Sequence, residues 1–311
     1  MQVDIPEELP QKPDWKKKLV SLLKYPVAVL ILVYVLRQTE LDKIEAYVRT
    51  LPPFWFILAL LAFSIAQVFS TLRMNLYYRE AGRHIDFWYA MKLCYVGLFY
   101  NIILPGGIGG DAYKIFLLKR AANFPVREGI RIQLQTRANG LLVLLLMLYA
   151  SVLFMPVPWS GLRVLGGVLL CCIVTLTAYM LLSKWLLKES SAMGLRALPY
   201  SVGVQSFNVL SMVILWKALG AHGELADYVF LFQLAAVAGM IPVTIGGLGI
   251  REFTFFKGGE LIEWLTGTMV DGELGVTISL LVFVITVASA LFGLPWIGRI
   301  AKMKPCHASV S

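Results

Sequence analysis

The chain alternates long apolar runs with short polar segments, which is the pattern of a helical membrane protein. Six runs are long enough to approach a full bilayer crossing, which takes about 20 residues in a helix. They lie at about 19–36, 54–72, 138–155, 164–182, 200–219 and 274–297. Two shorter apolar segments, 87–103 and 228–241, each end at a break that contains proline and glycine. We therefore predict an all-α integral membrane protein with about six full crossings and two shorter elements.

The two breaks resemble each other in sequence. When Pro105 is placed on Pro242, the following pairs also align: Ile108 and Ile245, Gly109 and Gly246, Gly110 and Gly247, Lys114 and Arg251. Helix-breaking residues at membrane depth are tolerated only where the freed backbone is buried in protein or lines a wet cavity. Close packing of helices on small residues would explain one such break. Two aligned copies favour a transport site between two halves of the chain.

The distribution of Lys and Arg indicates how the two shorter elements lie in the membrane. Basic loops stay on the cytoplasmic side, and the expected loop at 114–137 is the most basic one, with Glu128 as its only acid. A full crossing by 87–118 would place this loop outside. We therefore predict a re-entrant helical hairpin at about 87–118 that enters from the cytoplasm. A second hairpin at about 228–256 is predicted to enter from the outside, which makes an inverted repeat.

These assignments give one membrane domain with both termini in the cytoplasm. A tail at 1–18 carries a run of lysines, the membrane domain covers 19–300, and a basic tail at 301–311 follows. No signal cleavage site is evident, so the first run is expected to remain as an anchor. We expect the protein in the cytoplasmic membrane of a bacterium or an archaeon.

Composition agrees with this picture and narrows the function. Apolar residues make up 58% and charged residues 15% of the chain, and the mean hydropathy is +0.73, so there are too few charges to cover a soluble core. We interpret the net charge of +9 as basic cytoplasmic loops rather than as nucleic-acid binding. The four cysteines are expected to be free thiols. No metal-ligand spacing, nucleotide-binding loop or catalytic domain is evident, so we expect neither a cofactor nor a metal, and no enzyme.

Charged and polar residues beside the apolar segments are candidates for function, because they are costly in a membrane. The candidates are Arg73, Asp111, Lys114, Arg137, Asn139, Arg251 and Glu252. Asp111 and Glu252 could instead cap the helices that follow the breaks, and Arg73 and Arg137 could snorkel to the interface. Five amides are interpreted as interhelical hydrogen-bond partners rather than as ligands: Gln67, Asn101, Gln205, Asn208 and Gln233.

The candidate residues favour phosphate binding. Glycine-rich turns and helix N-termini bind anions through backbone N–H groups, and arginine binds two phosphate oxygens at once. The predicted substrate-binding residues are Arg73, Gly109, Gly110, Lys114, Arg137, Asn139, Gly246, Gly247 and Arg251. Asp111 and Glu252 are predicted to order the site or to carry a coupling proton. In so apolar a protein, the phosphate is expected to belong to the head group of an anionic membrane lipid.

The residues around the breaks resemble the transmembrane region of lysylphosphatidylglycerol synthase, a family of flippase-like proteins also called uncharacterised family 0104. The resemblance rests on the run from Leu104 to Asp111, on Lys114 and Arg137, and on Gly-Gly-Leu-Gly-Ile-Arg-Glu at 246–252. It covers about 50–300 and implies movement of lipids between leaflets, with members tied to aminoacylated phospholipids, hopanoids or lipid-linked sugars. Where other members tend to have arginine, this chain has Lys114, a weaker bidentate partner for phosphate.

The expected function is therefore a lipid flippase or translocase for a phospholipid or a polyprenyl-phosphate-linked sugar. The synthases add a soluble aminoacyl-transferase domain, and the 311 residues contain none, so we expect translocation rather than lysyl transfer. Two alternatives stay open. One is a membrane-embedded transferase acting on a lipid phosphate, with Asp111 or Glu252 as base. The other is a regulatory partner of a lipid- or glycan-modifying enzyme. A homo-oligomer is also compatible with the sequence.

Overall fold

The computed structural model describes residues 41–104, 109–159, 161–185, 191–240 and 247–303. Within these ranges the chain forms α-helices and two short 3-10 helices, and no strand. The predicted all-α class is confirmed. The predicted N-terminal tail at 1–18 and the first predicted crossing at 19–36 lie outside the described residues, as do 304–311 of the C-terminal tail.

The described helices follow one another with short connections. In chain order they are α2 (Leu41–Thr50), α3 (Pro53–Glu80), α4 (Phe87–Ile103), α5 (Gly109–Ala122), α6 (Val126–Val152), α7 (Gly161–Trp185), α8 (Ser191–Ala218), α9 (Leu225–Gly239), α10 (Ile250–Thr266), α11 (Gly272–Leu291), η1 (Leu294–Trp296) and η2 (Ile300–Lys302).

Five described helices are long and apolar enough to cross a membrane: α3, α6, α7, α8 and α11. They correspond to the predicted crossings at 54–72, 138–155, 164–182, 200–219 and 274–297. Among them α7 is peripheral, because only 6% of its apolar window is buried inside the protein. This helix therefore offers its apolar side chains to lipid. The chain is an integral membrane protein.

The basic segment 114–137 is not the loop that its charge predicts. Helix α5 continues to Ala122 and α6 begins at Val126, so only residues 123–125 separate the two helices. Similarly, α3 extends past its apolar run as far as Glu80. A helix that continues beyond its apolar stretch keeps its backbone hydrogen bonds and can still expose cations near its end, as α3 does with Arg79 and α5 with Lys119 and Arg120. A cluster of Lys and Arg residues can therefore indicate which side of the membrane a segment lies on even when the segment is helical and not a loop.

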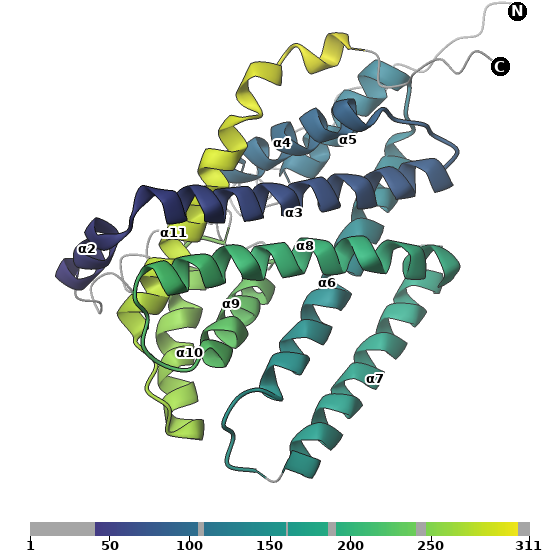
Figure 1. Cartoon of the computed structure of the whole chain (residues 1–311). Helices are drawn as coiled ribbons and strands as arrows, with labels where there is room; N and C mark the ends of the chain where they lie inside the picture. The colour runs from purple at the N-terminus through teal and green to yellow at the C-terminus, as the bar shows by residue number, and fades with distance from the viewer. Residues whose placement is uncertain (1–40, 105–108, 160, 186–190, 241–246, 304–311) are drawn as a thin grey trace, which may run out of the picture.

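Helices α3 and α8 lie side by side in the centre of the molecule and share the most extensive contact between described helices (Figure 1). Gly203 of α8 has no room for a Cβ atom beside the ring of Phe69, and this ring stacks on Phe207 with centroids 5.6 Å apart. The hydroxyl of Ser211 donates to the carbonyl of Ala59 at 2.8 Å. Close approach and interhelical hydrogen bonds of this kind are what hold helices together in lipid.

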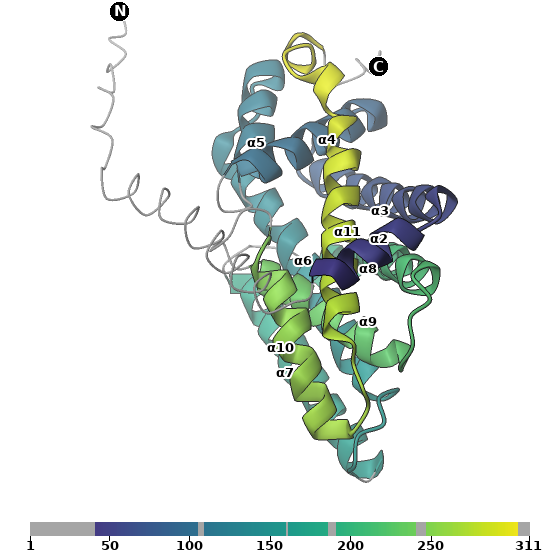
Figure 2. The ribbon, with the colours of Figure 1, turned by 90° about the vertical axis from the view of Figure 1, so that its left-hand side faces the viewer.

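The shorter helices form two pairs, α4 with α5 and α9 with α10, and each pair brackets one glycine-rich break. The pairs lie at opposite ends of the molecule, beyond α3 on one side and beyond α8 on the other (Figures 1 and 2). Helix α11 contacts both α10 and α4. A long, short, short, long succession thus occurs twice, in α3–α6 and in α8–α11. The predicted inverted repeat, with its re-entrant hairpins, stays a prediction.

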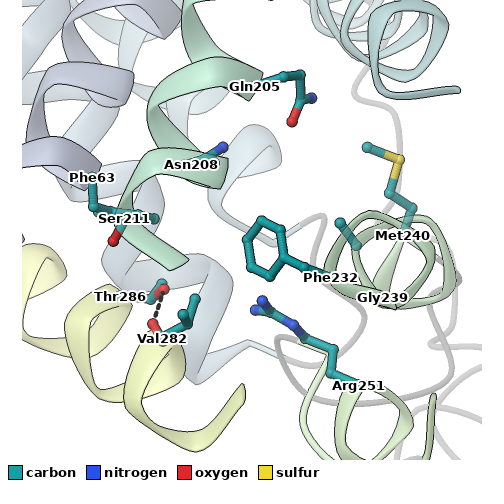
Figure 3. Close-up of a pocket in the computed structure, with 11 residues that line it drawn as sticks. Phe63, Gln205, Asn208, Ser211, Phe232, Gly239, Met240, Arg251, Val282 and Thr286 are labelled. Atoms are coloured by element: carbon teal, nitrogen blue, oxygen red, sulfur yellow. Dashed lines mark hydrogen bonds between the residues drawn. The ribbon is translucent and has the colours of Figure 1, made fainter. Parts of the chain in front are cut away.

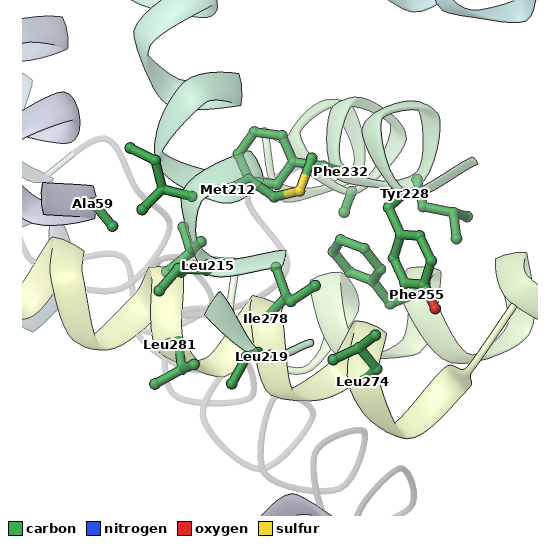
Figure 4. Packing of buried hydrophobic residues seen from close by; sticks show 14 of the residues in the cluster. Ala59, Met212, Leu215, Leu219, Tyr228, Phe232, Phe255, Leu274, Ile278 and Leu281 are labelled. Atoms are coloured by element: carbon green, nitrogen blue, oxygen red, sulfur yellow. The ribbon is translucent and has the colours of Figure 1, made fainter. Parts of the chain in front are cut away.

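A buried apolar cluster fixes the second pair against the centre (Figure 4). It joins Leu215 of α8, Tyr228 of α9, Phe255 of α10 and Ile278 of α11, all fully buried. Large buried aromatic rings contribute much of the packing in such a cluster. Because Phe255 lies one turn after Arg251, the cluster also holds the start of α10 in place.

Candidate functional site

Asp111 is the centre of a polar cluster at the first break. It lies in the first turn of α5 and is only 6% exposed. Its Oδ1 accepts a hydrogen bond from Lys114 Nζ at 3.1 Å, and its Oδ2 accepts one from Arg137 Nε at 2.6 Å. The Nη2 of Arg137 also lies 2.6 Å from Oδ2. Because Arg137 belongs to α6, this one carboxylate joins α5 to α6.

Two glycines allow α4 and α5 to approach each other beside this cluster. A Cβ atom on Gly110 would overlap the carbonyl oxygen of Gly97, and a Cβ atom on Gly97 would overlap Lys114 Cε. The N–H of Gly110 donates to Asn101 Oδ1 at 2.9 Å, so a side chain of α4 satisfies a donor that the helix start leaves free. Gly110 therefore serves packing and capping. Its N–H is occupied by Asn101 Oδ1 in this structure, and its role in phosphate binding stays a prediction.

The predicted phosphate ligands Lys114 and Arg137 are brought together, but they face Asp111. Lys114 is buried, whereas the side chain of Arg137 is 40% exposed. Two cations share one carboxylate, so the cluster keeps a net charge of about +1 if all three groups are ionised. Only Arg137 presents part of that charge at the surface of the protein.

Arg73 and Asn139 meet through Ser201, a residue that the sequence analysis did not single out. Arg73 Nη1 donates to Ser201 Oγ at 2.8 Å, and the Ser201 hydroxyl donates to Asn139 Oδ1 at 2.5 Å. Asn139 Nδ2 donates in turn to the hydroxyl of Tyr179 at 3.0 Å. Arg73 is 9% exposed, which excludes snorkelling, and its Nε has no hydrogen-bond partner in the described part of the chain. It is a buried cation held by neutral groups.

Glu252 caps helix α10. Its Oε2 accepts a hydrogen bond from the N–H of Gly249 at 2.6 Å, and its Oε1 accepts one from Ser279 Oγ at 2.8 Å. The side chain is fully buried. The capping alternative is thus confirmed for Glu252. Gly247 and Gly249 have φ values of 84° and 89°, a region that favours glycine, so the glycines shape the turn that leads into α10.

Arg251 points into a cavity of about 210 Å³ (Figure 3). The described lining residues come from α3, α8, α9, α10 and α11 and from Met240 after α9. The guanidinium carbon lies 5.8 Å from the centre of the Phe232 ring, a distance suited to a cation–π contact. Arg251 Nε is buried and has no hydrogen-bond partner among the described residues. None of the residues described as lining this cavity is acidic.

Helix α8 supplies most of the uncharged polar groups of this cavity. Asn208 and Gln205 face it (Figure 3), and the Oδ1 of Asn208 is buried without a partner in the described structure. Gln205 Nε2 donates to a backbone carbonyl of α6 at 3.3 Å. The hydroxyls of Ser211 and Thr286 each donate to a backbone carbonyl at 2.8 Å. Arg251 and Asn208 therefore hold the unsatisfied groups.

The predicted residues thus fall into separate places. Asp111, Lys114 and Arg137 form one cluster, Arg73 and Asn139 a second, and Arg251 a third. No residue of the first cluster lines the cavity of Arg251, so the described residues do not show the two breaks as walls of one site. Gly246 and the residues 105–108 lie outside the described residues.

Sequence reasoning found Arg251 but missed the role of its neighbours on α8. Ser201, Gln205 and Asn208 recur at i, i+4 and i+7 in an apolar helix, and this helical spacing was the signal that would have placed them on one face. Asn208 was interpreted as an interhelical hydrogen-bond partner. In the described structure its Oδ1 is buried and has no hydrogen-bond partner, so that interpretation stays a prediction.

Comparisons with known proteins identify the family. The sequence profile described as the lysylphosphatidylglycerol synthase TM region matches residues 21–293, which is most of the chain and includes both breaks, the Asp111 cluster and the Arg251 cavity. A comparison with curated proteins gives no significant match. The protein belongs to the lysylphosphatidylglycerol synthase TM region family.

Proposed function

We propose that the protein is a lipid flippase or translocase that moves an anionic, phosphate-bearing lipid between the leaflets of the membrane. The observation that carries the proposal is Arg251, a cation directed into a cavity among membrane helices without a hydrogen-bond partner for its Nε among the described residues. An unpaired cation inside a membrane is costly and is retained where it meets a ligand or an ion path.

The chemistry of Arg251 favours phosphate as its ligand. A guanidinium group donates two parallel hydrogen bonds to a phosphate or a carboxylate, and these bonds strengthen where water is excluded. The ring of Phe232 lies beside the cation, and the polar atoms of Gln205 and Asn208 complete a small site for a head group. Met240, which also lines the cavity, is an exposed residue, so lipid tails can remain in the bilayer on that side.

Helix length supports the proposed re-entrant hairpins. The paired helices α4, α5, α9 and α10 have 17, 14, 15 and 17 residues, so each is about 21–26 Å long, less than the ~30 Å of a hydrocarbon core. We infer that α4 and α5 enter from the cytoplasm and that α9 and α10 enter from the opposite side. Rocking of two such hairpins about a fixed binding site is how broken-helix repeats give alternating access.

The Asp111 cluster would serve this movement rather than hold the lipid. Its carboxylate joins α5 to α6 through Arg137, so a phosphate that approached the exposed part of Arg137 would compete with Asp111. Such an exchange of partners would loosen α5 from α6. The alternative of a membrane-embedded transferase has less support. Asp111 pairs with cations, and Glu252 accepts hydrogen bonds at both oxygens, so neither carboxylate is placed as a base ready to accept a proton.

Reconstitution tests the proposal. We expect purified protein in liposomes to accelerate the exchange of tail-labelled phosphatidylglycerol between leaflets, measured by reduction of the outer-leaflet label. Arg251→Gln should remove most of the acceleration. The matched control is Lys257→Gln, which removes a cation of the same helix that pairs with Glu260 away from the cavity. Exchange no faster than in protein-free liposomes, for phosphatidylglycerol and for a polyprenyl-phosphate-linked sugar alike, would refute the function.

A further inference from the structure

We propose that Asp227 is a proton-binding site and that its proton joins the start of α9 to the end of α10. The inference goes beyond the proposed lipid transport and does not depend on it. Asp227 lies in the first turn of α9 and precedes the predicted hairpin at 228–256. Its side chain is fully buried, and it is in none of the three clusters of predicted site residues.

The carboxyl group of Asp227 is buried without a cation. Its Oδ2 lies 2.7 Å from the hydroxyl oxygen of Thr268, and its Oδ1 has no hydrogen-bond partner among the described residues. The other two buried acids of the described structure differ, because Asp111 contacts two cations and Glu252 accepts hydrogen bonds at both oxygens. An ionised carboxylate is much more costly to bury than a neutral carboxylic acid. Burial without a counter-ion therefore favours the protonated form of Asp227.

A chain of short oxygen–oxygen contacts runs from this carboxyl group to the last turns of α10. Thr268 Oγ1, which lies beside Asp227 Oδ2, is also 2.6 Å from Thr266 Oγ1. Thr266 Oγ1 in turn lies 2.8 Å from the backbone carbonyl oxygen of Ile262. Separations of about 2.5–3.0 Å are those of O–H···O hydrogen bonds. Each of the three contacts therefore needs a proton between its two oxygens.

The available protons are too few if Asp227 is ionised. A threonine hydroxyl carries one proton and a backbone carbonyl carries none, so the two hydroxyls supply two protons for three contacts. The backbone N–H of Thr268 donates separately to Thr266 Oγ1 at 3.2 Å, which leaves the deficit unchanged. A carboxyl group protonated at Oδ2 supplies the third proton. Asp227 then donates to Thr268, Thr268 donates to Thr266, and Thr266 donates to the carbonyl of residue 262.

The charged groups around the chain of contacts also favour the proton. Thr268 lines a surface cavity together with the titratable residues Lys43 of α2, His222 and Glu224 before α9, Glu263 of α10, and Asp271 and Glu273 at the start of α11. The phenol of Tyr228, the residue after Asp227, is bound to the backbone of Asp271. Burial raises the pKa of the Asp227 carboxyl, and the negative charge of Glu224 adds to this rise against the opposing hydrogen bond with Thr268. Ionisation of Asp227 would break the chain and weaken the attachment of α9 to α10.

Infrared spectroscopy of the purified full-length protein tests the protonation directly. At about pH 5, where an ordinary aspartate is ionised, the difference between the spectra of wild type and Asp227→Asn should contain the carbonyl band of a protonated carboxylic acid. The band should disappear as the pH rises. Glu224→Gln is the matched control, because it changes an exposed acid just before α9, and it should retain the band of Asp227. The absence of an acid band at this pH would overturn the proposal.

A second variant keeps the infrared test decisive if Asp227→Asn does not fold. Thr268→Val removes the hydroxyl beside the acid, so it should move the acid band to higher frequency, as expected for a carboxylic acid that has lost its hydrogen bond. Thr254→Val is its control, because the hydroxyl of Thr254 donates to a backbone carbonyl within α10 at 2.7 Å and not to an acid. An acid band that does not move in Thr268→Val would contradict the chain of contacts.

Thermal unfolding tests the role of the proton. With a raised pKa, the proton stabilises the folded state fully below the unfolded pKa of about 3.9, and this stability is lost as the pH rises through the folded pKa. The melting temperature of wild type in detergent should fall by at least about 2 °C relative to Asp227→Asn between about pH 4 and pH 8. Over the same range, the protection of residues 266–271 from hydrogen exchange should decrease in wild type alone. A constant difference in melting temperature and equal protection in both proteins would overturn this role.

Discussion

Lys114 and Arg251 occupy equivalent positions after the two glycine-rich breaks, yet they have opposite surroundings. Lys114 Nζ lies 3.1 Å from Asp111 Oδ1, whereas Arg251 Nε has no partner among the described residues and its side chain faces a cavity. The sequence contains the reason. The residue three positions before Lys114 is Asp111, and the residue three positions before Arg251 is Leu248. The cation of the first half, Lys114, is therefore paired with a carboxylate, whereas the cation of the second half, Arg251, is available to a ligand.

Placing a carboxylate at residue 248 should convert the second half into the paired state. Leu248→Asp puts an acid three residues before Arg251, as Asp111 is before Lys114, although here in the turn that leads into α10. An acid so close in sequence would offset the charge of Arg251. We expect lipid exchange in liposomes to fall at least about tenfold. Leu248→Asn has the same shape without the charge and should retain most of the activity. An equal loss in both variants would show that packing rather than charge causes it.

Removing the charge of Asp111 should destabilise the protein, because Lys114 would remain buried without its anion. Breaking a buried ion pair from one side costs about 3–5 kcal/mol, so Asp111→Asn should lower the midpoint of thermal unfolding in detergent. The double variant Asp111→Asn with Lys114→Met should recover part of the loss, since it removes the unpaired cation as well. Additive effects of the two single changes would indicate that the pair does not couple.

The glycine contact between α4 and α5 should tolerate no larger side chain. Gly110→Ala would drive a Cβ atom into the backbone carbonyl of Gly97, which has no flexible end to move. We expect a clear loss of folded protein by size-exclusion chromatography. Gly166→Ala in α7 is the control, because no atom lies within 4 Å of its added Cβ and alanine favours a helix by about 1 kcal/mol over glycine. Equal behaviour of the two variants would contradict the packing argument.

Tyr47 links α2 to the start of α11 and should make part of the stability depend on alkaline pH. Partial burial and a 2.6 Å hydrogen bond to Asp271 raise the pKa of Tyr47 to about 12, above its ordinary value near 10. Since the folded state favours the neutral phenol, this contribution is complete below about pH 10 and is lost as the pH rises towards about 12. The difference in melting temperature between wild type and Tyr47→Phe should shrink across that range. A constant difference would refute the role of this hydrogen bond.

Several features of the protein follow from the sequence alone, because they depend on local patterns. Apolar runs of bilayer length predicted the five described helices that are long and apolar enough to cross a membrane, since lipid requires each helix to satisfy its own backbone. The two aligned breaks and their cations are also local, and they indicated Arg251. Glu252, three residues after Gly249, is a helix-start pattern that the capping alternative recognised. Local sequence patterns therefore marked the candidate residues, but they did not determine the role of each one.

Only the tertiary structure decided which of these residues act together. Asp111 meets Arg137 across 26 positions, and Arg73 meets Ser201 across 128. The Arg251 cavity draws on five helices. Such contacts depend on the crossing and rotation of whole helices, which local periodicity does not specify. For this reason the sequence identified four candidate cations, Arg73, Lys114, Arg137 and Arg251, and the packing determined that only Arg251 among them lines the described cavity.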